Sequence, residues 1–365
     1  MIDYLGRTRR TVNFLKTILF DYPEWTPARV NFLPAAWIKH RERLEELVLA
    51  HPRVFPGFKK GSVDFDFTAG IGNPLYELGR HTDCWGTVWN NIARGFDSQV
   101  DVEPLADWAA FDEWKKRLPD PMKDDQFGPR TEWDKLKANM DRARAAGGLA
   151  ESGPLPHGFF FMRLYYLRGL ENLMVDMATG EERLGELIRI IEDYSAAVIR
   201  KVLDLGAELV GLGEDLGMQT ALPISPAMWR KYVKPTYEAT IGLCRDRGVL
   251  VYLHSDGHIL EIIPDLIEVG VRMLNPQIRA NGLAGLRKYA RGKVALSQDL
   301  DRQLFPFATP SQVEDHIGEV FEGLYMKEGG LALQGEVGPE VPLENVEAIC
   351  RAMEKLCNLP EPEVT

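Results

Sequence analysis

The sequence predicts an α/β protein folded as a single (β/α)8 barrel domain over residues 1–365. In its second half, short apolar segments that end in polar residues alternate with longer amphipathic segments, which is typical of a parallel sheet with helical connections. Eight segments have the composition of buried strands, the number that a closed barrel needs. No GxGxxG loop follows any of them, which disfavours an open, doubly wound sheet.

The predicted strands are short and rich in aliphatic and aromatic residues. Strands four to eight are the clearest, because each ends in polar residues and is followed by a helical pattern. The first three are assigned from composition alone. In order, the eight segments cover residues 28–35, 62–68, 158–164, 207–215, 249–257, 271–277, 293–301 and 330–338.

Helices are predicted from apolar residues at helical spacing, most clearly over residues 181–205. The helix over 225–248 has Ser225 as its N-cap and Pro226 at its first position, where the missing N–H costs nothing. Further helices are predicted over 259–270, 281–292, 309–324 and 342–356. The segment from about 84 to 153 does not fit the alternation, and we expect an insertion between strands two and three that covers the pocket mouth.

Composition and charge restrict the classes of partner. The chain is 45% hydrophobic and 27% charged, which is enough apolar material for a large core. Its net charge of −11 is opposite to the basic footprint of nucleic-acid-binding proteins, so a nucleic-acid partner is not expected. The four cysteines include no CxxC pair, and no apolar segment has the roughly 18 residues of a membrane span. We therefore expect a cytoplasmic protein without a membrane partner.

Polar residues gather at the ends of the predicted strands, where barrel enzymes carry their catalytic groups. This concentration of carboxylates and amides at one rim is the main functional signal in the sequence. Asp83 follows strand two, and the ends of strands four to eight supply Glu214, Asp215, His254, Asp256, Asn275, Gln277, Asp299, Asp301, Gln334 and Glu336.

His254 and Asp256 lie two residues apart, so their side chains can point to the same side of the strand. With Glu336 they supply one nitrogen and two oxygen ligands, and a catalytic zinc site uses three protein ligands. The alternative is that these are polar rim residues that bind each other or the substrate.

Glu214 and Asp215 form a pair of adjacent carboxylates. One of them could have a raised pKa and serve as a general acid. Alternatively, one accepts backbone N–H groups and shapes the turn. Among the aromatic residues, Trp85 is the best pocket candidate because it neighbours Asp83, and Tyr252 is another. We expect substrate contacts from Trp85, Tyr252, Asn275, Gln277, Asp299 and Gln334.

Several motifs, in this order, resemble the uroporphyrinogen decarboxylase superfamily. They are HTDCWGTVW, PLADW, GLGEDLGMQTALPISPAMWRKYVKP, VYLHSDGHILEIIPDLIEVGVRMLNPQ, SQDLDRQLFPFATPSQV and LQGEVGPEVPLENV. In the true decarboxylases an RQAGR motif grips the substrate, whereas the matching region here reads ARVNFLPAAWIKHR. Asp83 matches their invariant aspartate, but Glu336 stands where they have a histidine.

The chain resembles the corrinoid-linked methyltransferase branch more than the decarboxylases. That branch binds zinc through a His-x-Cys pair after strand five and a Cys after strand eight; those positions are His254, Asp256 and Glu336 here. The resemblance implies a methyltransferase with zinc, whose corrinoid arrives on a partner protein. Carboxylates are harder ligands than thiolates and leave the metal a stronger Lewis acid toward oxygen. This favours O-demethylation of a small methoxylated donor, with Asp83, Glu214 and Asp215 as further catalytic residues.

Two other functions remain open from the sequence. A metal-free lyase, similar to the decarboxylases, would act on a small carboxylic acid and would not need a corrinoid. A non-catalytic barrel that binds a small molecule is the third, although holding many polar groups together at one rim is costly without a role. Resemblance to the decarboxylases also implies a homodimer.

Overall fold

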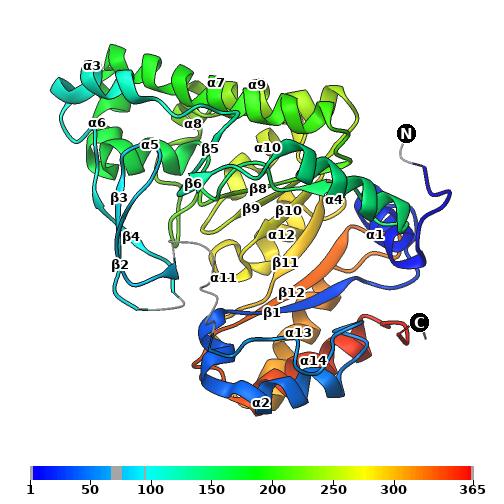
Figure 1. The fold of residues 1–365 in the computed structure, drawn as a ribbon. Helices are drawn as coiled ribbons and strands as arrows, with labels where there is room; N and C mark the ends of the chain where they lie inside the picture. The colour runs from blue at the N-terminus through cyan, green and yellow to red at the C-terminus, as the bar shows by residue number, and fades with distance from the viewer. Residues whose placement is uncertain (1–2, 67–75, 94–95, 363–365) are drawn as a thin grey trace.

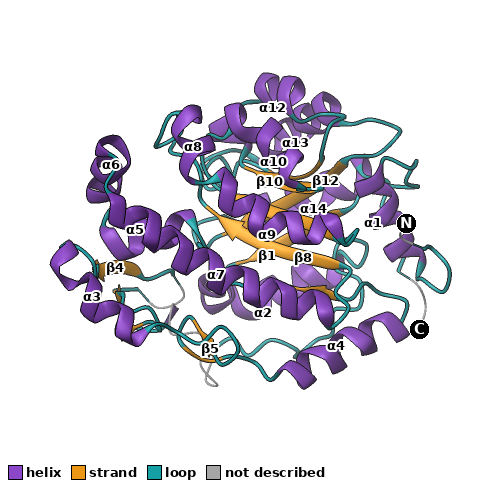
Figure 2. Cartoon of the chain, turned by 90° about the horizontal axis from the view of Figure 1, so that it is seen from above, coloured by secondary structure: helices purple, strands orange, loops and turns teal. Residues whose placement is uncertain are grey.

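A computed structural model describes residues 3–66, 76–93 and 96–362 of the chain. Its centre is a curled parallel sheet of seven strands in the order β1-β12-β11-β10-β9-β8-β7 (Figures 1 and 2). The prediction of a TIM-barrel-like α/β fold is confirmed. The strands are β1 (Ala28–Phe32), β7 (Glu151–Ser152), β8 (Leu209–Glu214), β9 (Leu250–Ser255), β10 (Met273–Pro276), β11 (Ala295–Asp299) and β12 (Leu331–Val337).

Helices cover the outer face of this sheet, and most of the buried apolar residues lie between the two layers. They are α2 (Pro34–Ala50), α7 (Glu182–Asp204), α8 (Pro226–Tyr232), α9 (Lys234–Asp246), α10 (Ile263–Val269), α11 (Ile278–Asn281), α12 (Leu283–Tyr289), α13 (Pro310–Leu324) and α14 (Leu343–Leu356). Helices α5 (Phe161–Arg168) and α6 (Leu170–Thr179) pack on one another beyond the carboxyl ends of the strands (Figure 1). Helix α1 (Arg9–Leu19) packs Leu15 and Ile18 against the first residues of several strands and closes that end of the barrel.

The connection from residue 79 to 150 forms structure of its own. Its antiparallel sheet lies beside the carboxyl ends of the parallel strands, and its last helix returns to α1 near their amino ends (Figure 1). Its antiparallel sheet has the order β2-β3-β4. The elements are β2 (Gly79–Thr82), β3 (Val88–Asn91), β4 (Gln99–Val102), α3 (Phe111–Trp114), β5 (Asp124–Asp125), β6 (Gly128–Pro129) and α4 (Trp133–Ala145). None of the helices in the described part of the chain has the length and apolarity to cross a membrane.

Two predicted strands are wrong where the structure describes them. Residues 62–66 form irregular structure that ends in a turn, and the rest of the predicted strand 62–68 lies outside the described residues. The segment 158–164 leads into helix α5, and the strand that pairs with β8 is β7 instead. The carboxylate of Glu214 explains the helix, because it accepts the backbone N–H groups of Phe160, Phe161 and Met162. A buried apolar run cannot by itself distinguish a strand from a helix.

The helices of the second half are confirmed, with one break. Ser225 accepts a hydrogen bond from the backbone N–H of Met228, as an N-cap does. The predicted helix over 225–248 divides at Val233 into α8 and α9, and Pro235 lies in the first turn of α9. Proline cannot donate the hydrogen bond that would continue a helix, which accounts for the division.

The loops after β8 and β9 are joined by close backbone contact, and they carry two carboxylates of the pocket. Gly217 donates to the carbonyl of Asp256, and His258 donates to that of Met218. Gly257 has φ +80°, and a Cβ at this position would overlap the Gly217 carbonyl. Only glycine satisfies both conditions here.

We predict that Gly257→Ala lowers the free energy of unfolding by about 2–4 kcal/mol, because strain at positive φ adds to a steric clash. Gly248→Ala is the matched control, since Gly248 has φ +69° and open space around its Cβ position. The control should cost roughly 1 kcal/mol. Urea unfolding of both variants measures the difference. Equal losses of unfolding free energy in the two variants would show that the clash with Gly217 adds nothing, because the two loops can move apart without an energetic cost.

Candidate functional site

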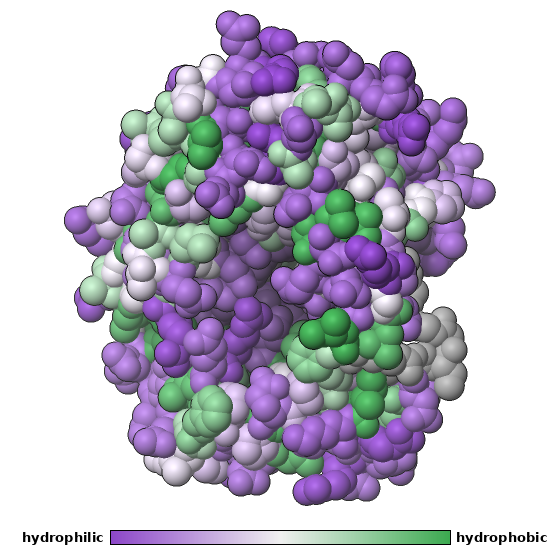
Figure 3. Space-filling model, turned by 90° about the vertical axis from the view of Figure 1, so that its left-hand side faces the viewer, coloured by the Kyte–Doolittle hydropathy of each residue, from purple (hydrophilic) through white to green (hydrophobic). Residues whose placement is uncertain are grey.

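A cavity of about 1030 Å³ opens at the carboxyl ends of the parallel strands. Figure 3 shows it as a hollow lined mainly by hydrophilic residues, with hydrophobic patches at its border. Such a volume lies at the upper end of the range for small-molecule sites. The residues around it are Leu33, Tyr76, Phe96, Asp97, His157, Asp215, His254, Asp256, Arg279, Arg302, Gln303, Pro306, Phe307, Glu336, Gly338 and Glu340.

His254 is oriented by the neighbouring strand. Its partner in the register of β9 and β10 is Asn275, whose Oδ1 lies 2.8 Å from His254 Nδ1. Asn275 donates its amide N–H to the carbonyl of Ser297, so Oδ1 is the atom that accepts from the imidazole. The proton therefore resides on Nδ1 in the neutral ring, and Nε2 keeps a free lone pair directed at the pocket.

Two carboxylates complete a possible ligand group around this ring. Ligand atoms of His254, Asp256 and Asp299 all lie within 4.8 Å of one another. Nε2 of His254 is 3.3 Å from Oδ1 of Asp256. The Oδ1 atoms of Asp256 and Asp299 are both buried; that of Asp256 has the His254 ring as its partner, and that of Asp299 accepts no hydrogen bond from the described residues. A buried carboxylate oxygen without a partner is costly, and a divalent cation would satisfy it. The donor set therefore fits a metal ion.

The charges in this group change the pKa values of its members. Burial lowers the pKa of His254, but the contact with Asp256 outweighs it and the pKa is raised to about 9. Burial raises the pKa of Asp256, yet the hydrogen-bonding contact and charge of His254 hold it below its ordinary value. Burial raises the pKa of Asp299 to about 6, although the charge of His254 opposes this. The metal-free site is thus an imidazolium held by carboxylates.

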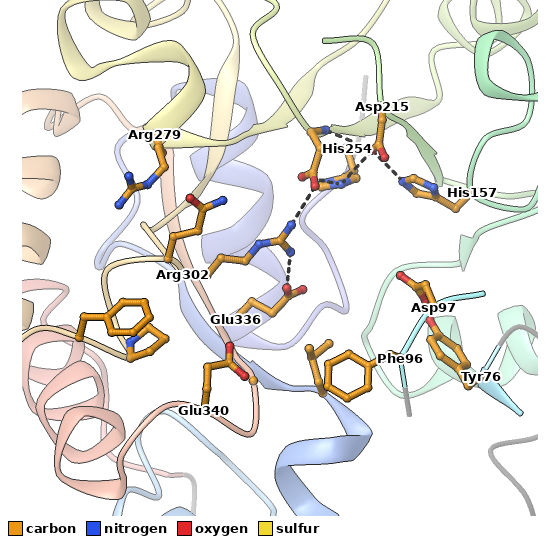
Figure 4. A pocket seen from close by; sticks show the side chains of 16 residues that line it. Tyr76, Phe96, Asp97, His157, Asp215, His254, Arg279, Arg302, Glu336 and Glu340 are labelled. Atoms are coloured by element: carbon orange, nitrogen blue, oxygen red, sulfur yellow. Dashed lines mark hydrogen bonds and ion pairs between the residues drawn. The ribbon is translucent and has the colours of Figure 1, made fainter. Parts of the chain in front are cut away.

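Glu336, the third predicted metal ligand, is held apart from this group by Arg302. The guanidinium donates to Asp256 Oδ2 at 2.9 Å through Nη2 and to Glu336 through Nη1 (Figure 4). Arg302 follows Asp301 in the loop after β11. Of the three predicted ligands, the structure brings His254 and Asp256 into contact and connects Glu336 to them through the arginine.

The adjacent carboxylates Glu214 and Asp215 have different environments. Glu214 is fully buried, and its three backbone hydrogen bonds lower its pKa, yet burial is the larger effect and raises the pKa to about 7. It shapes the turn before α5, which is the alternative that the sequence left open. Asp215 faces the pocket, where Oδ1 lies 3.4 Å from His157 Nε2 and 3.9 Å from His254 Nε2. These three residues form a second group with the spacing of metal ligands.

Asp83 and Trp85 lie outside the residues that line the cavity. The Asp83 carboxylate is buried and pairs with Arg163, and it also accepts hydrogen bonds from the backbone of Trp85 and Thr87 and from the indole of Trp89. Trp85 is 5% exposed and packs against Trp114 and Tyr194. In this structure both residues support the connection that precedes α4.

The other predicted substrate contacts are distributed along the barrel interior. Tyr252 and Gln334 both contact Arg29, and Tyr252 lines a smaller cavity near the amino ends of the strands. Asn275 acts through His254, as described above. Gln277 accepts from the backbone N–H of Gly257 and borders side cavities next to the main one. Asp299 belongs to the ligand group.

Several pocket residues were not predicted from the sequence. Arg302 and His157 contact the predicted carboxylates directly, and Tyr76 and Asp97 form the opposite wall (Figure 4). Asp97 is hydrogen-bonded to Tyr76, and burial raises its pKa. Arg302 could have been found, because it directly follows the strand-end residue Asp301. His157, Tyr76 and Asp97 follow no recognisable strand pattern.

Fold and pocket together define an α/β barrel enzyme with an acidic, histidine-containing site at its strand ends. The chain belongs to the uroporphyrinogen decarboxylase (URO-D) family, whose model matches residues 161–356. This confirms the resemblance carried by the sequence motifs. No curated protein sequence matches the chain significantly.

Solved structures match the chain to different extents. A methyltransferase from Methanosarcina mazei is 15% identical, with a TM-score of 0.58 over 96% of this chain and 99% of the other. A putative vitamin-B12 independent methionine synthase from Listeria monocytogenes is 12% identical, with a TM-score of 0.39 over 63% of this chain and 70% of the other. A dihydropteroate synthase from Xanthomonas albilineans is 17% identical, with a TM-score of 0.30 over 46% and 62%.

We predict that Asp83→Ala lowers the free energy of unfolding by about 3–5 kcal/mol, because it leaves the buried guanidinium of Arg163 without its counter-charge. Asp101→Ala, which breaks the exposed pair with Arg80, should cost less than about 1 kcal/mol. Chemical unfolding of both variants measures the contrast. A small loss at Asp83 would show that its role is not structural.

The pKa of His254 predicts a pH dependence of stability in the metal-free protein. Its folded pKa of about 9 exceeds the ordinary 6.5, so its stabilisation is complete below pH 6.5 and is lost as pH rises through 9. The loss should be on the order of 3 kcal/mol. Asp256→Asn should bring the pKa of His254 toward 6.5 and remove this loss. Histidine NMR titration and unfolding at several pH values check both, and an unchanged pKa in the variant would contradict the assignment.

Proposed function

We propose that this protein is a methyltransferase that moves a methyl group from a small methoxylated donor to a corrinoid carried on a partner protein, with zinc as Lewis acid. The observation that carries the proposal is the group of His254, Asp256 and Asp299, whose ligand atoms lie within 4.8 Å of one another and include a buried Asp299 oxygen without a hydrogen-bond partner among the described residues. Membership of the uroporphyrinogen decarboxylase family and a fold similar to that of a methyltransferase support it.

His254 and Asp256 would hold the zinc ion. Asp299 lies in the same group, and Glu336 lies on the other side of Arg302. When bound by one imidazole and two carboxylates, zinc supplies a Lewis acid that withdraws charge from the donor oxygen.

The chain's own side chains would supply orientation and a proton. Asn275 fixes the imidazole of His254 in the required tautomer. His157 is about half exposed and lies in the pocket with its Nε2 atom near Asp215. This pair of residues could supply a proton to the leaving oxygen. Tyr76, Phe96 and Phe307 give the wall an aromatic surface suited to a methoxylated ring. The open mouth seen in Figure 3 gives a corrinoid on another protein access to the methyl group.

A second candidate function is a metal-free lyase that acts on a small carboxylic acid. One specific observation favours it: Arg302 neutralises Asp256 and Glu336 without any metal ion. A guanidinium in the pocket also suits the binding of a substrate carboxylate. The lyase activity would persist in the presence of chelating agents and would need no corrinoid, so experiment can separate the two candidate functions.

We predict that the purified protein binds about one zinc ion per chain and that His254→Ala weakens zinc binding by about 100-fold or more, because a ligand is lost. His258→Ala is the matched control, since His258 contacts Ala280 and Glu261 and does not belong to the ligand group. Elemental analysis and calorimetric titration measure both. Zinc-loaded protein should then demethylate methoxylated aromatic compounds in the presence of a reduced corrinoid protein.

Two results would contradict this function. If the protein bound no zinc even when zinc was added, the Lewis acid would be excluded and the metal-free lyase would be favoured. Zinc binding without methyl transfer from any methoxylated compound to the corrinoid protein would retain the metal site and exclude the donor class.

A further inference from the structure

Arg302 occupies the junction between the metal-ligating group and the open cavity. Its guanidinium bridges Asp256 at the end of β9 and Glu336 on β12. These are two of the three positions at which the sequence places metal ligands. The side chain is 41% exposed and borders three adjoining cavities, so it has room to turn.

The pocket needs positive charge near these carboxylates. Five carboxylates line the main cavity (Asp97, Asp215, Asp256, Glu336 and Glu340), whereas the arginines that line it are Arg279 and Arg302. Arg279 is paired with Asp301 through Nε at 2.9 Å and Nη2 at 2.8 Å. Among the described residues, Arg302 is therefore the arginine that balances Asp256 and Glu336.

We propose that Arg302 and a divalent metal ion are alternative counter-ions of the same carboxylates. In the metal-free protein the guanidinium holds Asp256 and Glu336. Metal binding expels the guanidinium toward the open cavity, and Glu336 is then free to join His254, Asp256 and Asp299 as a ligand. The inference rests on the proposed metal-dependent function and specifies how the site is loaded.

Electrostatics make the two states exclusive. The guanidinium is permanently charged, and Nη2 lies 2.9 Å from the carboxylate that a metal ion would share. A unit charge a few ångströms from a divalent ion in a half-buried site repels it strongly, because screening there is incomplete. The opposite role, in which Arg302 orients Asp256 for the metal, would contribute a smaller and favourable effect. Removal of the arginine should therefore strengthen metal binding rather than weaken it.

The loop that carries Arg302 is suited to this exchange. Asp301 is fixed by Arg279, its carboxylate accepts the backbone N–H of Gln303, and its own N–H donates to His316. The backbone is thus anchored while the Arg302 side chain extends into open space. Figure 4 shows the guanidinium between Glu336 and the His254 group, with the cavity beside it.

The test is calorimetric titration of zinc into chelator-treated wild-type protein and into Arg302→Gln, Arg279→Gln, Glu336→Gln and the double variant Arg302→Gln/Glu336→Gln. We expect Arg302→Gln to bind zinc about tenfold or more tightly, since two ion pairs no longer have to break. Arg279→Gln removes an equal charge from the same cavity without touching the ligands. Asp301 keeps its hydrogen bonds with Gln303 and His316, so the loop stays anchored and the affinity should change less than about threefold. Glu336→Gln should weaken binding in both backgrounds.

Melting temperature provides a second measurement that separates exchange from misfolding. Metal-free Arg302→Gln should melt below the wild type, because Asp256 and Glu336 lose their counter-charge, and zinc should raise its melting temperature more than that of the wild type. Zinc binding by Arg302→Gln but not by the wild type would support the exchange and overturn the zinc-dependent function.

Other outcomes overturn the inference. Equal or weaker zinc binding by Arg302→Gln, with normal binding by the wild type, would reject the exchange and leave the metal site standing. An equal gain in zinc affinity in Arg279→Gln would show that the effect comes from the net charge of the cavity and not from Arg302 in particular. No binding by any variant would remove both the metal-dependent function and this inference.

Discussion

The carboxylates that the parallel strands bring to one rim must be balanced by positive charge, and the arrangement of the pocket follows from this requirement. Asp215, Asp256, Asp299 and Glu336 come from the ends of β8, β9, β11 and β12, two pairs of neighbouring strands on either side of β10. The imidazolium of His254 and the guanidinium of Arg302 reduce the repulsion between these carboxylates. The pKa of His254 is raised to about 9 against the effect of burial. A single divalent ion would balance the same carboxylates in place of the two side-chain cations.

Glu214 shows a different solution to the same problem. It is as deeply buried as any carboxylate in the chain's described part, but its partners are three backbone N–H groups rather than a cation. The amino end of α5 offers exactly those unpaired donors together with the positive end of the helix dipole. Its neighbour Asp215 points into the pocket instead. Two adjacent carboxylates therefore serve structure and chemistry separately.

The parts of the site that could be predicted are those fixed by sheet geometry. Polar residues after apolar strands converge because parallel strands end at one edge, and His254, Asp256 and Glu336 all line the cavity at that edge. The strand predicted over 158–164 failed because its apolar residues are buried in either conformation, and a carboxylate distant in sequence decides for the helix. His157 and Arg302 were missed because their roles depend on which strand end each loop faces. A single sequence does not encode that proximity locally.

The carboxylates at the predicted ligand positions and the arginine between them belong to one arrangement. A carboxylate has two oxygens that can serve different partners, and Asp256 directs Oδ1 toward His254 and Oδ2 toward Arg302. A thiolate at the same position would offer one sulfur atom and a poorer match to a planar guanidinium. Replacing thiolates by carboxylates therefore changes more than the hardness of the ligands. In the proposed exchange an arginine holds the carboxylates of the metal-free site, and the affinity for a metal ion would depend on how readily that arginine leaves.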